Sequence, residues 1–270
     1  MAIKLIAVDM DGTFLDHNQS YNRKRFSEQY SEMKKQGIKF IVASGNQYYQ
    51  LKSFFTEIEE QIAFIAENGA YIVDEGKDIY NGEMSKETIN KVLNMLKQYD
   101  YPELVVCGKN GAYVHASVTE EFYQQTLRYY HQLSRISDFE KIDDTIFKFA
   151  TSFPEDMAAS VLDEFHKHVG KYVTPVSSGH GDIDLIIPGI HKARGIKLLQ
   201  ERWGIADEET AAFGDSGNDL EMISHVKYGV AMSNAIPAIK DAAMYITSSN
   251  NNEGVLDAID LILARKSPFY

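Results

Sequence analysis

Short apolar segments alternate with segments of helical spacing along much of this 270-residue chain. Residues 3–8, 38–43 and 62–66 have the apolar character of buried strands, and residues 22–36 and 48–59 between them have helical spacing. Near-continuous apolar strands are typical of parallel sheets, because helices cover both faces of such sheets. The alternation therefore predicts an α/β fold built on a mostly parallel sheet.

The alternation changes after residue 82 and resumes near residue 189. In between, strands are predicted at residues 104–107, 112–114, 147–153 and 183–187. Helices are predicted there at residues 86–98, 120–133 and 154–169. Beyond them we expect a helix over 191–202, strands over 210–213 and 228–232, a helix from 218 and a last helix over 253–264. This predicts a discontinuous core, residues 1–81 and 189–270, with an α+β cap domain, residues 82–188, lying over the strand ends.

Composition narrows the classes of partner. The hydrophobic fraction of 44% and the charged fraction of 24% are those of a globular protein. The formal net charge of −12, with no clustered Lys or Arg, disfavours nucleic acid as a partner. No apolar run approaches the roughly 18 residues of a membrane span. We therefore expect a cytoplasmic protein with a small-molecule partner and no membrane or nucleic-acid partner; the oligomeric state stays open.

The N-terminal strand runs directly into Asp9-Met10-Asp11-Gly12-Thr13. Ligands of α/β proteins bind at the carboxyl ends of the strands, so both carboxylates are expected to face a cleft. Such a pair suits phosphoryl chemistry, with Asp9 attacking phosphorus and Asp11 acting as the acid and then the base. The alternative is a turn with two solvated aspartates.

A second acidic, glycine-containing turn, residues 214–219, follows a later strand. Mg²⁺ takes oxygen ligands from one or two carboxylates, water and phosphate, so Asp215 beside Asp9 is a sensible magnesium site. Asp219 is placed to orient those ligands. An aspartate that caps a helix starting near Asn218 is the alternative, and both roles are compatible.

Two further segments offer groups to an anion. Ser44-Gly45-Asn46 follows the second strand and supplies a hydroxyl and backbone amides, although Ser-Gly is also an ordinary turn. Lys192 opens a helix after Pro188-Gly189 and is placed to neutralise a phosphoryl group, although an isolated lysine is usually solvated.

Other reactive or aromatic side chains have more ordinary interpretations. Cys107 ends an apolar strand-like segment and is expected to be a small core residue. Tyr48, Tyr49, Tyr129 and Tyr130 are expected to pack in half-buried positions rather than to form a sugar platform.

Taken in order, the motifs at residues 9–13, 44–46, 192 and 214–219 resemble those of the haloacid dehalogenase (HAD) superfamily of aspartyl-phosphate phosphatases. The insertion after the third strand resembles the C2B cap of the Cof-type branch, subfamily IIB, which has a Rossmann-like core. At finer grain, residues 43–51, 183–189 and 191–193 resemble those of bacterial sugar phosphatases of the SupH type.

The resemblance implies roles for individual residues. Asp9 is the nucleophile and Asp11 the acid and base. The implied magnesium ligands are the Asp9 carboxylate, the Asp11 main-chain carbonyl and Asp215, and the implied phosphate contacts are Ser44, Gly45, Lys192 and Asn218. Many relatives have Arg where this chain has Asn46, which favours a neutral polyol at that contact over a second anionic group.

The leading hypothesis is a Mg²⁺-dependent hydrolase of small phosphomonoesters, above all hexose or pentose phosphates, that acts through an aspartyl-phosphate. A phosphotransferase or phosphosugar mutase shares the aspartyl-phosphate step and remains an alternative. A non-enzymatic receiver module, which also uses clustered aspartates, is the second. No motif encodes which sugar phosphate is bound.

Overall fold

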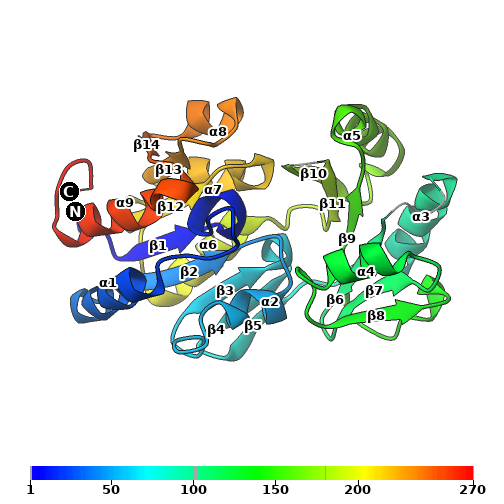
Figure 1. Cartoon of the computed structure of the whole chain (residues 1–270), viewed down its shortest axis with the longest axis horizontal. Helices are drawn as coiled ribbons and strands as arrows, with labels where there is room; N and C mark the ends of the chain where they lie inside the picture. The colour runs from blue at the N-terminus through cyan, green and yellow to red at the C-terminus, as the bar shows by residue number, and fades with distance from the viewer. Residues whose placement is uncertain (1, 100–102, 180, 270) are drawn as a thin grey trace.

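The computed structural model describes residues 2–99, 103–179 and 181–269. Within these ranges the strands form an eight-stranded sheet and a six-stranded sheet, which lie next to each other along the long axis of the molecule (Figure 1). The larger sheet takes strands from both sides of residues 82–188, and the smaller sheet takes only strands from within them. We refer to residues 82–188 as the cap and to the remainder as the core.

The core sheet has the order β14-β13-β12-β1-β2-β3-β4-β5. Its strands are β1 (Leu5–Val8), β2 (Lys39–Ala43), β3 (Ala63–Ala66), β4 (Tyr71–Asp74), β5 (Lys77–Asn81), β12 (Thr210–Gly214), β13 (Tyr228–Met232) and β14 (Tyr245–Thr247). Neighbours from β14 to β3 pair in parallel, and β4 and β5 add an antiparallel edge. The α/β fold with a mostly parallel core sheet and an α+β insertion is therefore confirmed.

Helices cover the core sheet. They are α1 (Arg23–Gln36), α2 (Tyr48–Ser53), α6 (Lys192–Trp203), α7 (Leu220–His225), α8 (Pro237–Ala242) and α9 (Gly254–Leu263). α1 packs against α9, and α7 packs against both α6 and α8. The Asn22 side chain caps the start of α1, and Gly37 ends the helix in the left-handed conformation (φ 71°), which glycine adopts without steric cost.

The cap sheet has the order β10-β11-β9-β6-β7-β8 and is antiparallel except for the β7–β8 pair. Its elements are β6 (Val105–Gly108), β7 (Ala112–His115), β8 (Leu133–Ile136), β9 (Ile146–Ser152), β10 (Thr174–Gly179), β11 (Asp182–Ile186), α3 (Lys86–Leu96), α4 (Glu120–Thr126) and α5 (Glu155–Val169). Cys107 is fully buried in β6, as expected of a core residue.

Two predicted helices are too long. The helix predicted over 48–59 ends at Ser53, whose hydroxyl donates to the Gln50 carbonyl, and the tighter turns that follow bury Phe55 in the core. The helix predicted over 120–133 ends at Thr126, because the chain turns there to bury Tyr130 beside Cys107 and then forms β8.

Several elements were not predicted, namely β4, β5, β8, β10, β14 and α8. β5 and β8 are edge strands whose residues are exposed or only half-buried, so neither carries a strong apolar pattern. β14 is only three residues long.

The strand order brings the carboxyl ends of β12, β1, β2 and β3 to one edge of the core sheet, because these neighbours are parallel. The motifs at residues 9–13, 44–46, 67–69 and 214–219 directly follow these four strands. Over the described residues, no helix is both long and apolar enough to cross a membrane.

Candidate active site

Asp9 follows β1 and is 96% removed from solvent, and a tight turn over Met10–Phe14 comes directly after it. Gly12 in this turn has φ +72°. A Cβ atom on Gly12 would lie 2.5 Å from Asp215 Oδ2, so only glycine lets the Asp215 carboxylate come so close. The Thr13 hydroxyl donates to Asp215 Oδ1 (2.7 Å) and holds that carboxylate against the turn.

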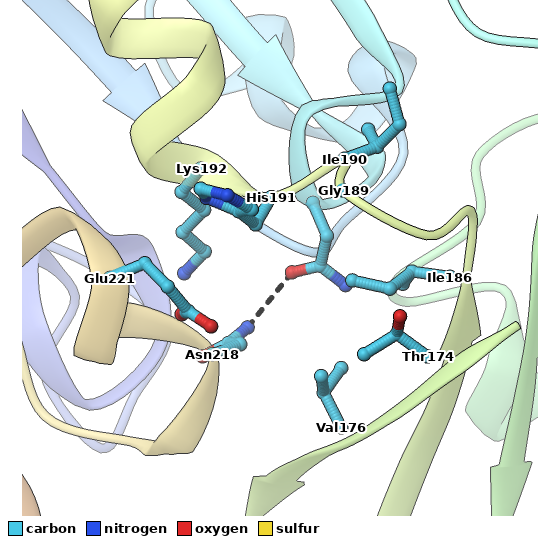
Figure 2. Close-up of a pocket in the computed structure, with 10 residues that line it drawn as sticks. Thr174, Val176, Ile186, Gly189, Ile190, His191, Lys192, Asn218 and Glu221 are labelled. Carbon is cyan, nitrogen blue, oxygen red and sulfur yellow. Dashed lines mark hydrogen bonds between the residues drawn. The ribbon is translucent and has the colours of Figure 1, made fainter. Parts of the chain in front are cut away.

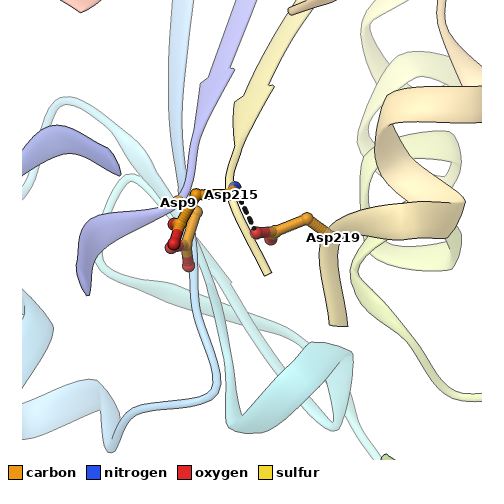
Figure 3. Close-up of side chains that lie close together, drawn as sticks. All are labelled: Asp9, Asp215 and Asp219. Atoms are coloured by element: carbon orange, nitrogen blue, oxygen red, sulfur yellow. Dashed lines mark hydrogen bonds between the residues drawn. The ribbon is translucent and has the colours of Figure 1, made fainter. Parts of the chain in front are cut away.

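Carboxylates from two neighbouring strand ends converge at this point (Figure 3). Asp9, Asp215 and Asp219 each contribute an oxygen atom to a group whose members all lie within 4.8 Å of one another. Asp219 Oδ2 accepts hydrogen bonds from the backbone N–H groups of Asp215 (2.9 Å) and Ser216 (3.0 Å), so Asp219 fixes the turn that carries Asp215.

Lys192, the first residue of α6, supplies the positive charge of this group. Its Nζ donates to Asp9 Oδ1 (2.6 Å) and to Asp219 Oδ1 (2.7 Å), and the side chain is 99% buried. Burial alone would lower the pKa of Lys192, but the carboxylates of Asp219 and Asp9 outweigh burial and raise it. Lys192 is therefore a charged residue of the site and not a solvated surface lysine.

The electrostatics of the group suit a divalent cation. Burial, then repulsion from Asp219, raises the pKa of Asp9 well above its ordinary value and that of Asp215 to about 6. With all three carboxylates ionised, Lys192 compensates one of three negative charges and two remain. A divalent cation would balance them, and Mg²⁺ prefers such oxygen donors. The acidic cluster of the structure therefore fits the metal dependence that is general among HAD-type sites.

The other predicted phosphate contacts follow β2. Ser44 is buried, and its Oγ accepts the backbone N–H of Asn46 (3.1 Å), so its own hydroxyl proton points elsewhere. Asn46 Nδ2 donates to Asp11 Oδ2 (2.6 Å). Among the described residues, the other oxygen of that carboxylate, Asp11 Oδ1, is buried without a hydrogen-bond partner. Asn46 therefore orients Asp11 with one carboxylate oxygen held and one available.

Asn218 reaches the site from the turn after β12. Its Nδ2 donates to Asn68 Oδ1 (3.0 Å), the bond dashed in Figure 2. Both residues line a cavity of about 40 Å³ together with His191, Lys192, Thr174 and Glu221. That volume admits water but not a sugar phosphate, so a leaving group needs a different side of the site.

Tyr129 belongs to the cap. Burial, then the negative charges of Asp11 and Asp182, raises the pKa of Tyr129 above its ordinary value, so its hydroxyl is within electrostatic range of Asp11. Tyr129 remains 41% exposed, whereas Tyr130 is buried as packing. The expectation that both tyrosines pack therefore describes Tyr130 better than Tyr129.

The predicted site residues come from the turns after β1, β2 and β12 and from the first residue of α6, which the fold brings to one edge of the core sheet. Thr13 and Asn68 make contacts that the sequence did not single out, although each lies in the segment that follows a predicted strand. Two polar residues of the cap, Lys148 and Asp184, also reach this edge. Asp184 lies within residues 183–189, which carry part of the family resemblance, but neither residue was predicted to contact the core.

The α/β core with its inserted cap and its buried aspartate–lysine group defines a phosphate-ester hydrolase of the HAD-like class. Residues 6–259 match the model of the haloacid dehalogenase-like hydrolase family. The chain belongs to this family and is a phosphoric monoester hydrolase. This membership favours an enzyme over a receiver module.

Individual relatives cover almost the whole chain. The Escherichia coli (strain K12) protein 5-amino-6-(5-phospho-D-ribitylamino)uracil phosphatase YbjI is 48% identical over 269 residues, which cover 100% of this chain and 99% of that one. The crystal structure of SMU.1108c from Streptococcus mutans UA159 is similar with a TM-score of 0.92 and 33% identity, over 97% of this chain and 100% of that one.

The fold also matches that of BT4131, a sugar phosphatase of HAD subclass IIB. The TM-score is 0.81 with 21% identity, over 95% of this chain and 98% of that one. At this identity the similarity supports the fold alone.

Proposed function

We propose that the protein is a Mg²⁺-dependent phosphatase of small sugar or polyol phosphates that acts through a phosphate ester of Asp9. The observation that carries the proposal is the convergence of Asp9, Asp215 and Asp219 on the buried Lys192 ammonium at the carboxyl edge of the core sheet. This convergence supports a nucleophilic carboxylate, a positive charge beside it and a cation site in one place.

In the proposed first step, a carboxylate oxygen of Asp9 attacks phosphorus and the bond from phosphorus to the leaving oxygen breaks. Asp11 gives its proton to that oxygen, so an alcohol leaves. In the second step, Asp11 takes a proton from water, the water oxygen bonds to phosphorus, and the Asp9–phosphorus bond breaks. Inorganic phosphate is released and both aspartates return to their starting states.

Mg²⁺ would be held by the carboxylates of Asp9 and Asp215 and by the main-chain carbonyl of Asp11. When bound, it supplies positive charge that stabilises the negative phosphoryl oxygens. Asp219 orients the Asp215 turn through two backbone N–H groups, and Lys192 restrains the Asp9 carboxylate. Ser44, Gly45 and Asn218, with Lys192, are proposed to grip the phosphate.

The proposed substrate class rests on the cap side of the site. Asn46 adds no positive charge there, so a neutral polyol chain next to the phosphate suits the site better than a second anionic group. Tyr129 near Asp11 offers an aromatic face to whatever the polyol carries. The relative from E. coli is named for a substrate with a phosphorylated ribityl chain on a uracil ring. We include this compound in the proposed class.

The test is a substrate panel with pure protein: p-nitrophenyl phosphate, hexose and pentose phosphates, and 5-amino-6-(5-phospho-D-ribitylamino)uracil, each with Mg²⁺ or with EDTA. We expect turnover that requires Mg²⁺ and the highest kcat/KM for a polyol or sugar phosphate. The D9N variant is expected to lose about 10³-fold or more in kcat, because an amide is a poor nucleophile, while its melting temperature stays close to wild type. Near-normal turnover by D9N would rule out the covalent route.

A further inference from the structure

A second group of buried charges lies between the cap and the core. Lys148 of β9 and Asp184 of β11 belong to the cap, and Glu67 and Asn68 follow β3 of the core. Each is at least 94% buried. We refer to these four residues as the interdomain cluster. The chemistry proposed above uses none of them.

Lys148 is the centre of the interdomain cluster. Its Nζ donates to the Gly45 carbonyl (2.7 Å) and contacts both carboxylate oxygens of Asp184 (3.0 and 3.1 Å), and it lies 3.6 Å from Glu67 Oε2. Burial lowers the pKa of Lys148, but Asp184 and Glu67 together outweigh burial and raise it. The ammonium is therefore charged. One of its contacts is the backbone of residues 44–46, which are predicted to bind phosphate and which we call the phosphate loop.

From Asp184, hydrogen bonds continue to the other side of the phosphate site. Asn68 Nδ2 donates to Asp184 Oδ2 (2.6 Å), and Asn68 Oδ1 accepts from Asn218 Nδ2 (3.0 Å). The backbone N–H of Asn68 also donates to the Ser44 carbonyl (3.0 Å). Two cap residues thus connect to three of the four proposed phosphate contacts, Ser44, Gly45 and Asn218.

The absence of a side chain at Gly45 fits this contact between the cap and the phosphate-binding residues. A Cβ atom on Gly45 would lie 3.2 Å from the Asn68 amide and 3.3 Å from Asp184 Oδ2, closer than most real Cβ contacts. The bare backbone of Gly45 therefore lets the cap carboxylate approach the phosphate loop.

Stability alone does not account for this cluster. A buried ion pair is often no more stable than apolar residues of similar volume, because desolvation offsets the attraction of the charges. What the ion pair adds is direction: an ammonium group with three donors fixes a carbonyl in one orientation.

We propose that Lys148 of the cap is a positioning residue for the phosphate site. It holds the Gly45 backbone directly. Through Asp184 and Asn68 it also holds the Asn218 amide in the orientation that binds phosphate. The inference rests on the proposed function and deepens it. Its consequence is that seating of the cap and binding of phosphate favour each other, since such linkage is reciprocal.

The test compares K148M with K109M. Lys109 also joins cap to core, through Asp78 Oδ2 (2.7 Å), but its side chain is 33% exposed, and its ammonium lies against Asp78 and over the Tyr71 ring. Inorganic phosphate is the probe. We measure its inhibition constant and the rise in melting temperature that it causes with Mg²⁺ present. The second measurement needs no turnover. Mg²⁺ affinity without phosphate is the control.

For K148M we expect phosphate to bind about tenfold to hundredfold more weakly. kcat/KM should fall by a similar factor for p-nitrophenyl phosphate and for a sugar phosphate alike, because the defect lies at the phosphate end. Mg²⁺ affinity should not change, and K109M should stay within about twofold of wild type. Unchanged phosphate binding by K148M, or a loss confined to the larger leaving group, would overturn the proposal.

The double variant K148M/D184L separates positioning from stability. Replacing both charges by apolar side chains is expected to recover most of the melting temperature that K148M loses, while phosphate binding stays weak. If phosphate binding recovers together with stability, Lys148 has only a structural role and the inference fails. Failure of the proposed function has a different signature, because wild-type protein would then show no Mg²⁺-dependent turnover or D9N would remain active.

Discussion

At the scale of single residues, the molecule keeps two lysines charged in its interior by surrounding each with carboxylates. Lys192 contacts Asp9 and Asp219, and Lys148 contacts Asp184. Glu67 lies 3.6 Å from Lys148 Nζ, and among the described residues neither of its carboxylate oxygens has a hydrogen-bond partner. Burial, the largest cause, raises the pKa of Glu67 from 4.5 to about 7.

This raised pKa makes the stability of the protein depend on pH. Because the folded state binds the Glu67 proton more tightly than an unfolded chain does, the stabilising contribution is complete below pH 4.5 and is lost as the pH rises through about 7. E67Q cannot ionise. It should match wild type near pH 5 and exceed it near pH 8 by about 1–3 kcal/mol in unfolding free energy. Urea titrations at both pH values measure this, and an identical pH dependence of the two proteins would contradict it.

At the scale of elements, helix α6 positions Lys192 by packing closely on β3. Gly195 lies one turn after Lys192, and a Cβ atom there would lie 2.8 Å from Ile65 Cγ2. Glycine inside a helix is normally about 1 kcal/mol less favourable than alanine. Its presence here reflects the close approach of helix and strand.

The G195A variant tests this packing. We expect it to be less stable than wild type by about 1–3 kcal/mol, since overpacking outweighs the gain in helix propensity. K197A, at an exposed position of the same helix, should stay within about 0.5 kcal/mol. The denaturant midpoints of wild type, G195A and K197A measure these differences. A G195A protein as stable as wild type would contradict the close packing of α6 on β3.

The elements that could be predicted from sequence are those whose pattern reflects their own burial. β1, β2 and β3 are continuous apolar segments because helices cover both faces, and the residues that follow β1 and β2 were recognisable as site candidates, whereas Asn68 after β3 was not. β5 is an exposed edge strand with no such pattern. Lys148 and Asp184 act through contacts between two domains, and no spacing within one strand encodes those contacts.

At the scale of the whole molecule, we propose that core and cap are separate folding units, and that the two covalent connections between them lie together. The backbone N–H of Gly82 bonds to the Ala70 carbonyl, and a Cβ atom on Gly82 would lie 3.0 Å from Ile187. The chain therefore enters and leaves the cap side by side. Across the boundary, Tyr71 stacks on Phe147, with ring centroids 5.6 Å apart.

Replacing residues 82–188 by a short Gly-Ser linker tests this division. We expect a core that unfolds cooperatively and is still stabilised by Mg²⁺, since its carboxylates all lie outside the cap. Preference among phosphate esters should fall to within about tenfold, because the cap contacts to the leaving group are gone. A core that does not fold, or one that keeps the wild-type preference, would contradict the boundary or the role assigned to the cap.

The central claim is that Asp9 carries the phosphoryl group, and the D11N variant tests it most directly. p-Nitrophenolate leaves without a proton, so D11N should complete the first step but hydrolyse the phosphate ester of Asp9 slowly. We expect a burst of about one p-nitrophenolate per chain, and acid-quenched samples should carry phosphate on Asp9 within the tryptic peptide of residues 5–23. Steady product formation with no burst and no phosphate on that peptide, or phosphate on a different residue, would contradict the account.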